Sequence, residues 1–267
     1  MSPPLISVIT TLYNCEKYVK KSLDSIISQS FSQPFEWLIL SDGPTDSTWK
    51  IVEEMNFSHP HCQVIRVPSA DNIKIPRRRN QAIAMAKGKY IAIHDGDDIS
   101  FPDRLELQAS FLESHPSIFC VGGHAVQIDL DDNVTGFMDY PEEEHPRLLR
   151  QLLVERRNPM IDPTTMFRRD AFLKLGRYTT REEIYTVPDM DLWCRAVLAG
   201  HKMANIKKPL ISYRSNPDGM TNSKKSEMIY AHVVTWREFS YKYREKFMSR
   251  QNKIYEKQRK IVDERRT

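Results

Sequence analysis

The chain has 267 residues, of which 39 are Lys or Arg and 35 are Asp or Glu, and this length suits one large domain with or without an appendage. Its formal net charge is +4, and its nine glycines form neither an ordinary dinucleotide-binding fingerprint nor a P-loop, so both phosphate-binding motifs are excluded. No apolar run reaches the roughly 18 residues that a bilayer requires, and the N-terminus lacks the pattern of a secretion signal, so we expect a cytoplasmic protein.

Residues 1–125 alternate short apolar runs with helical patterns, which is typical of βαβ units. The strands of this part are predicted at residues 5–11, 36–40, 63–67, 90–93 and 118–121. The helices are predicted at residues 16–28, 47–55, 77–86 and 101–112. The expected fold class is therefore α/β, with an open, mostly parallel sheet flanked by helices.

Residues 126–222 continue with mixed elements. Asp131-Asp132-Asn133 predicts the turn of a hairpin over residues 126–137. Helices are predicted near residues 146–156, 170–175 and 190–199, and strands near residues 164–168 and 210–213. A polar segment at residues 215–223 is rich in turn-forming residues and ends this part.

The C-terminal tail carries most of the positive charge. Residues 224–267 contain 13 Lys and Arg against 6 Asp and Glu, a local +7, whereas the other 223 residues carry 26 against 29, a net −3. The pattern predicts a helix over residues 226–263 in which aromatic and basic residues interleave. Such a helix suits contact with anionic lipid headgroups. The alternative is a helix that packs on the body of the protein or on a second copy in a homo-oligomer.

Polar and acidic residues follow three of the predicted strands. In an open α/β sheet, ligands bind outside the carboxyl ends of the strands. Tyr13 and Asn14 follow the first strand, Asp42 follows the second, and Asp95-Gly96-Asp97-Asp98 follows the fourth. We therefore expect a binding site at this edge of the sheet.

Asp95 and Asp97 are separated by one residue at a strand end, so their carboxylates can present oxygens together. Mg²⁺ or Mn²⁺ requires such oxygens when the ion is also bound to a diphosphate. The alternative is an ordinary turn, because Asp-Gly is a favoured turn pair.

Charged residues also open two predicted helices. Arg77, Arg78 and Arg79 lie at the start of the third helix, where backbone N–H groups favour an anion. A phosphate between a cation and one or two of these arginines would account for them, and a solvated charge run is the alternative. Asp189 and Asp191 begin the helix at residues 190–199, either as capping residues or as carboxylates that accept a proton from a hydroxyl.

Taken together, these segments resemble the family 2 glycosyltransferases from Ile6 to about Arg214. The matching segments come in the family's order: SVITTLYNCEKYVKKSLDSIISQSF, WLILSDGPTDST, RRRNQAIAMAKGKYIAIHDGDD with FPDRL, PTTMFRRDAFLKLGRY and VPDMDLWCRAVLAG. The resemblance implies the GT-A fold, a nucleoside-diphosphate sugar donor, a divalent cation and inversion at the anomeric carbon.

The resemblance also implies roles for the residues at the strand ends. Tyr13 and Asn14 look like part of the nucleoside pocket, and Asp42 matches an aspartate that accepts a base N–H, which suits uracil. Arg79 matches an arginine near the base and phosphates. Asp95 matches a contact to ribose or metal.

The remaining implied roles concern the metal and the base. Asp97 matches the direct metal ligand, and Asp189 matches the general base of the family's Glu-Asp pair. Pro188 stands where the family has the glutamate. Asp191 is therefore the substitute candidate for the base, and a catalytically impaired binding subunit is an alternative function. The Q-x-x-R-W motif of processive synthases is absent, which indicates transfer of one sugar per encounter.

The implied organisation is a nucleotide-sugar-binding half at residues 1–125, an acceptor-binding half of the same domain at residues 126–222, and a basic aromatic helical tail at residues 223–267. The implied enzyme is a hexosyl- or N-acetylhexosaminyltransferase of bacterial surface polysaccharide biosynthesis. It would act on a hydroxyl of a lipid-linked acceptor, peripherally on the inner face of the plasma membrane.

Two rival functions compete with this interpretation. A nucleotidyltransferase would normally carry a glycine-rich, lysine-containing loop after the first strand, and that segment has no glycine. A nucleic-acid-binding protein would use the basic aromatic tail, but the acidic body argues against it, so we expect no nucleic-acid partner.

Overall fold

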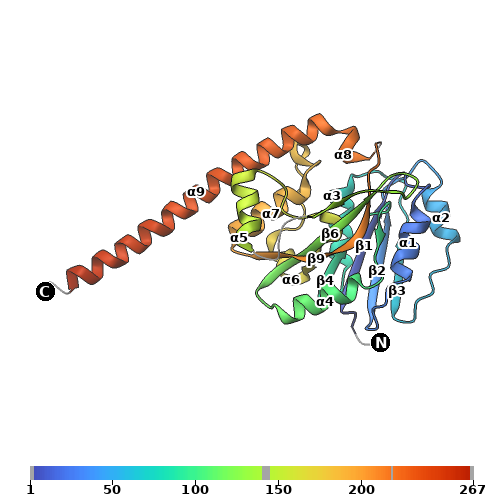
Figure 1. Ribbon diagram of the computed structural model, residues 1–267, viewed down its shortest axis with the longest axis horizontal. Coiled ribbons are helices and arrows are strands. Elements are labelled where there is room, and N and C mark those ends of the chain that lie inside the picture. Colours follow the sequence, from blue (N-terminus) through green and yellow to red (C-terminus); the bar gives the residue numbers. More distant parts are fainter. Residues whose placement is uncertain (1–2, 140–144, 218, 265–267) are drawn as a thin grey trace.

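The structure is a computed structural model that describes residues 3–139, 145–217 and 219–264. Its centre is a mixed sheet flanked by helices (Figure 1). The strands follow the order β3-β2-β1-β4-β8-β6-β9-β5, with β7 paired to β6. The strands are β1 Ile6–Leu12, β2 Phe35–Ser41, β3 Cys62–Val67, β4 Tyr90–Ile93, β5 Ile99–Ser100, β6 Ile118–Ile128, β7 Val134–Met138, β8 Met166–Arg168 and β9 Lys202–Arg214. The helices are α1 Val19–Ile27, α2 Thr48–Glu54, α3 Ile75–Met85, α4 Arg104–Ser114, α5 His145–Arg150, α6 Arg169–Leu175, α7 Pro188–Ala199, α8 Met220–Ser223 and α9 Lys225–Glu264, with short 3₁₀ turns η2 Asp162–Thr164 and η3 Glu182–Ile184.

The first half of the sheet is parallel, as predicted. β1 pairs in parallel with β2 and β4, and β2 pairs in parallel with β3. Every residue of β1, β2 and β4 is buried, because helices cover both faces. One face packs against α1, α2 and α4, and the other packs against α3, α6, α7 and α9. This half can therefore offer side chains to a ligand chiefly at the strand ends.

The second half of the sheet is mixed. β8 lies antiparallel to both β4 and β6 and so joins the two halves. β6 and β9 pair in parallel, and β5 pairs antiparallel with β9. The predicted hairpin is confirmed, because β6 and β7 pair across the turn that contains Asp131-Asp132-Asn133.

The sequence prediction underestimated the length of two strands. The segments predicted at residues 118–121 and 210–213 are parts of β6 and β9, which contain 11 and 13 residues. Exposed lysines interrupt the apolar pattern of β9 at Lys207 and Lys208, because part of this strand faces solvent. The helix predicted at residues 146–156 is α5 followed by a π-helical turn over Gln151–Glu155. The two-residue strand β5 was not predicted.

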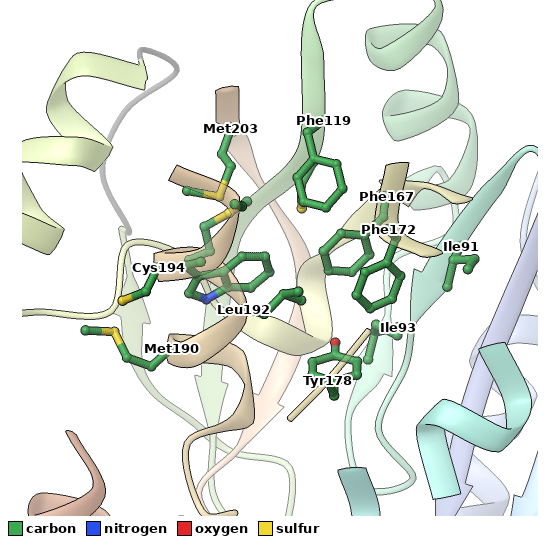
Figure 2. Close-up of a cluster of buried hydrophobic side chains, with 14 of the residues drawn as sticks. Ile91, Ile93, Phe119, Phe167, Phe172, Tyr178, Met190, Leu192, Cys194 and Met203 are labelled. Atoms are coloured by element: carbon green, nitrogen blue, oxygen red, sulfur yellow. The ribbon is translucent and has the colours of Figure 1, made fainter. Parts of the chain in front are cut away.

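Aromatic residues fill the core on the α6 and α7 side of the sheet (Figure 2). The ring of Phe167 in β8 stacks on Phe172 and Trp193, with centroid distances of 4.6 and 5.6 Å. Tyr178 meets the Phe172 ring edge-on at 5.5 Å. This packing fixes the position of the Tyr178 hydroxyl, which reaches a carboxylate described below.

Helix α9 begins against the body and then extends away from it (Figure 1). Ala231, Thr235 and Phe239 are buried at intervals of four residues, the spacing of one helix face, and Ala231 and Phe239 belong to the same core as α7. The Trp236 indole N–H donates to the Leu152 carbonyl at 3.1 Å. Packing on the body, one of the two alternatives for the tail, is thus confirmed for these turns. Residues 265–267 of the predicted tail lie outside the described residues.

No helix in the described part of the chain is long and apolar enough to cross a membrane.

The packing of α9 yields a stability prediction. Phe239→Ala removes a side chain that is 2% exposed, and we expect it to lower the free energy of unfolding by about 3 to 5 kcal/mol. Tyr241→Ala, two residues away and 66% exposed, should change it by less than about 0.5 kcal/mol. Urea unfolding followed by tryptophan fluorescence measures both. Equal stability of the two variants would show that α9 does not pack on the body in solution.

Candidate active site

The loops after β1 and β2 are held together by Asn14. Its backbone has φ 43°, a left-handed conformation that asparagine tolerates. Its side-chain oxygen accepts a hydrogen bond from the Thr45 N–H at 2.8 Å. Tyr13 beside it is 45% exposed, so its ring is available to a ligand. Both predicted residues thus lie at the sheet edge, but Asn14 already has a partner within the protein.

Asp42, at the end of β2, is buried and accepts hydrogen bonds from the Ile73 N–H at 3.0 Å and from Arg78 Nε at 3.2 Å. Arg78 also donates to the Asp71 carbonyl at 2.7 Å. This ion pair therefore orders the segment between β3 and α3. A cleft of about 480 Å³ lies next to it, lined by Ser41, Pro44, Trp49, Glu53, Pro68, Ser69 and Ala70.

Arg79 is the centre of the acidic part of the site. Its buried guanidinium forms ion pairs with Asp95, which follows β4, and with Asp162, which precedes β8. Although burial disfavours the charge of Arg79, these two carboxylates raise its pKa well above the usual value. The Tyr178 hydroxyl donates to Asp162 at 2.9 Å. The sequence led us to expect a phosphate between a cation and these arginines; in the structure Arg79 contacts Asp95 directly, and Asp162 is a further partner.

Asp162 was not identified from the sequence. It stands immediately before the PTTMFRR segment and belongs to no motif by itself. Burial, with a smaller contribution from the Asp189 and Asp95 carboxylates, raises the pKa of Asp162 to about 6 against the opposing effect of Arg79. The only feature of the sequence that could have indicated Asp162 was its position before the buried strand β8.

Asp97 has the properties expected of a cation ligand. Burial raises the pKa of Asp97 to about 6, and the neighbouring Asp95 carboxylate adds to this effect. Among the described residues, no set of three or more His, Cys, Asp or Glu side chains is arranged to hold a metal ion. One or two carboxylates suffice for Mg²⁺ when diphosphate oxygens complete its shell. Asp97 and Asp95 therefore fit an ion that arrives with a diphosphate.

Arg214, at the end of β9, holds the acidic loop in place. Its N–H donates to Asp98 Oδ1 and its Nε donates to the Asp97 carbonyl, both at 2.9 Å. Its other nitrogens reach the Asp129 carbonyl at 2.7 Å and the Asp132 carboxylate at 2.5 Å. Asp98 is thus a buried structural residue, while Asp97 next to it is half-buried. Sequence reasoning did not identify Arg214, because its partners are more than 80 residues away.

Asp189 and Asp191 have different surroundings on the first turn of α7. Asn158 donates a hydrogen bond to Asp189. The Asp189 carboxylate lies close enough to Asp162 to raise the pKa of Asp162. Asp191 accepts from Arg195 Nε at 2.7 Å. Arg195 also donates to the carbonyls of Leu175 and Arg177 at 2.7 and 2.6 Å. Asp189 is therefore electrostatically coupled to the acidic cluster, whereas Asp191 pairs with an arginine that fixes the end of α6.

Comparison with known proteins identifies the family of this chain. The model of the family described as "Glycosyl transferase family 2" matches residues 7–176. EpsE of Bacillus subtilis is 31% identical over 217 residues, which cover 81% of this chain and 75% of EpsE. The Escherichia coli enzyme WfaP, named as a UDP-Glc:alpha-D-GlcNAc-diphosphoundecaprenol beta-1,3-glucosyltransferase, is 26% identical over 226 residues, which cover 84% of this chain and 83% of WfaP.

A solved structure shares the fold. It is the mannosyltransferase PcManGT of Pyrobaculum calidifontis in complex with GDP-Man and Mn²⁺, with a TM-score of 0.64 and 16% sequence identity. The likeness covers 88% of this chain and 64% of PcManGT, so the chain spans about two thirds of that protein's length. The sheet with its flanking helices is therefore the GT-A fold that the sequence led us to expect. The family model covers more than half of the chain, and the chain belongs to glycosyl transferase family 2.

Proposed function

We propose that this glycosyltransferase moves one sugar from a nucleoside-diphosphate sugar to a hydroxyl acceptor with inversion. The observation that carries this proposal is the cluster around Arg79, in which a half-buried carboxylate, Asp97, lies beside Asp95 and a buried cation. Such a cluster suits a diphosphate bound together with a divalent cation. Residues 1–125 would bind the donor, and residues 126–222 would contribute to the acceptor side.

We assign binding of the donor's nucleoside to the residues after β1 and β2. The Tyr13 ring is exposed and can lie against a base, while Asn14 keeps the two loops together. Asp42 is buried and accepts from Ile73 and Arg78 at Oδ1, and Oδ2 is the oxygen that would accept a base N–H. A uracil N–H fits that acceptor, and the UDP-Glc in the name of WfaP supports a UDP-sugar.

Asp97, with Asp95, would hold Mn²⁺ or Mg²⁺. Such an ion supplies charge neutralisation to the departing diphosphate. The Mn²⁺ in the PcManGT structure supports this assignment. Arg79 would add positive charge on the other side of Asp95, so the leaving group would meet cations from two directions.

Asp189 is the proposed general base. The acceptor oxygen attacks the anomeric carbon while the bond from that carbon to the diphosphate oxygen breaks, and the hydroxyl proton passes to the Asp189 carboxylate. Asn158 would orient that carboxylate through its hydrogen bond. Asp191 is the alternative base, and its ion pair with Arg195 makes it the less available of the two.

The acceptor is proposed to be a lipid-linked saccharide of bacterial surface polysaccharide biosynthesis, and the transferred group a hexose or N-acetylhexosamine. The diphosphoundecaprenol acceptor in the name of WfaP supports this class. The outer turns of α9, beyond the part that packs on the body, would then contact the anionic inner face of the membrane. An impaired binding subunit remains the second candidate, because Pro188 replaces the family's glutamate.

Nucleotide binding tests the donor and metal assignments. A UDP-sugar at about 100 times its Kd should stabilise the protein by about 2.7 kcal/mol, and the shift in Tm should require Mn²⁺. Asp97→Asn should lose the Mn²⁺ requirement together with most of the shift. Asp170→Asn, an exposed carboxylate on α6, is the matched control and should respond as the wild type does. A screen of UDP, GDP and dTDP sugars in which none shifts Tm would contradict the proposal.

Turnover tests the base and the second candidate function. Asp189→Asn should lower kcat by about 10²- to 10⁴-fold with little change in donor binding. Asp191→Asn should retain more activity than Asp189→Asn and should lower Tm, because Arg195 loses its carboxylate partner. The opposite order would assign the base to Asp191. Absence of any transfer by the wild type, with donor binding intact, would favour the impaired subunit.

Vesicle flotation tests the membrane contact. A variant that ends at Met248 lacks seven Lys and Arg and three Asp and Glu but keeps the turns that pack on the body. The full chain should float with phosphatidylglycerol vesicles at low salt, and this variant should float several-fold less, because each basic residue contributes about 1 kcal/mol near an anionic surface. Phosphatidylcholine vesicles serve as the control. Equal flotation of both proteins would rule out the outer turns as the contact.

A further inference from the structure

A second cavity lies outside the residues discussed so far. It has a volume of about 300 Å³ and is lined by Glu182, Glu183, Tyr185, Thr186, Glu227 and Tyr230. The first four residues belong to η3 and the segment before α7, and the last two belong to the first turns of α9. All six lie beyond residue 176, where the family match ends. The pocket is therefore built by parts of the chain that the family model does not describe.

Each carboxylate of this pocket has a cationic partner. Glu182 pairs with Lys74 and with Arg77 at 2.7 Å, and Glu183 pairs with Arg181 at 2.7 Å. Glu227 pairs with Lys224 at 3.4 Å.

Charge is balanced across the network. Arg181 also pairs with Glu238 of α9 at 2.9 Å, so four carboxylates face four cations in this network. Such a balance favours an uncharged ligand, because an added ion would have to displace one of these partners.

Two tyrosines give the pocket its aromatic surface. The Tyr185 hydroxyl donates to Glu227 at 2.8 Å, and Lys74 Nζ lies 4.4 Å from the centre of the Tyr185 ring. Tyr230 is 61% exposed, so its ring is free to receive a ligand. A sugar ring suits this combination, because its C–H face packs on an aromatic ring while its hydroxyls donate to carboxylates.

The pocket lies next to the proposed general base in the chain. Thr186 lines the cavity, and Asp189 follows it by three residues at the start of α7. Lys74, the residue before α3, contacts both Glu182 and Tyr185, and Arg79 lies in α3. The lining of the pocket and its partner Lys74 are therefore close in sequence to Asp189 and Arg79.

We propose that this pocket binds an uncharged sugar ring of the acceptor and so presents the acceptor hydroxyl to Asp189. The inference rests on the proposed function and adds to it the site that selects the acceptor. The start of α9 is then part of the acceptor site, in addition to residues 126–222.

Saturation-transfer difference NMR on the full chain with UDP and Mn²⁺ tests this site. The probes are the methyl glycosides of glucose, galactose, mannose and N-acetylglucosamine, with methyl glucuronide as the charged comparison. At least one neutral glycoside should bind the wild type, more tightly than the glucuronide does. Tyr230→Ala should weaken that binding at least fivefold, and Tyr230→Phe, which keeps the ring, should restore most of it.

Tyr241→Ala is the matched control, because Tyr241 lies on the same helix, is 66% exposed and is outside the pocket. It should bind the glycoside as the wild type does. The site is refuted if Tyr230→Ala binds like Tyr241→Ala, or if no neutral glycoside binds the wild type.

The Tm shift given by UDP-sugar and Mn²⁺, measured on the same samples, distinguishes failure of the pocket assignment from failure of the proposed function. A normal shift together with either refuting result rejects the pocket alone. No shift in the wild type rejects the proposed function, and the pocket assignment falls with it.

Discussion

A buried guanidinium between two carboxylates joins the halves of this molecule. Arg79 comes from α3, Asp95 follows β4, and Asp162 precedes β8, the strand that links the parallel and mixed parts of the sheet. Removing one member of such a buried network typically costs about 3 to 5 kcal/mol, because it leaves an uncompensated charge. The same cation sets the charge of the site. Two carboxylates against one guanidinium leave a net negative cluster next to Asp97, which a divalent cation would complement.

Hydrogen bonds from Arg214 and Ser22 hold the acidic loop after β4, residues 95–98, in place. Arg214 bonds to Asp98 and to the Asp97 carbonyl, and the Ser22 hydroxyl donates to the Asp95 carbonyl at 2.9 Å. These contacts use the Asp98 carboxylate and two backbone carbonyls, and none of them involves the Asp97 carboxylate. Burial and the neighbouring Asp95 carboxylate raise the pKa of Asp97, while the charge of Arg214 opposes this shift.

Helix α9 combines two roles along its length. Its first turns belong to the body through Ala231 and Phe239 and contribute Glu227 and Tyr230 to the second cavity. Its outer turns extend away from the body and belong to the basic part of the chain (Figure 1). In the proposed function, one helix would thus connect acceptor selection to the membrane surface that carries the acceptor.

Much of the fold and the candidate site was predictable from local sequence. Alternating apolar runs and helical periods identified β1, β2, β4 and their helices, because strands buried on both faces read as continuous apolar segments. The long strands β6 and β9 were shortened in the prediction, since residues that face solvent break that pattern. Asp42, Asp95 and Asp97 were found because they directly follow such strands.

The sequence by itself determined the family, the parallel half of the sheet and the acidic residues at its edge, because each of these is encoded by neighbours along the chain. Only the tertiary structure decided which charged side chains contact one another. Asp162 reaches Arg79 across 83 residues, and Arg214 reaches Asp98 across 116. The second cavity likewise needs η3 and α9 to pack together. Contacts at such separations depend on how the strands and helices pack, which no local pattern of residues specifies.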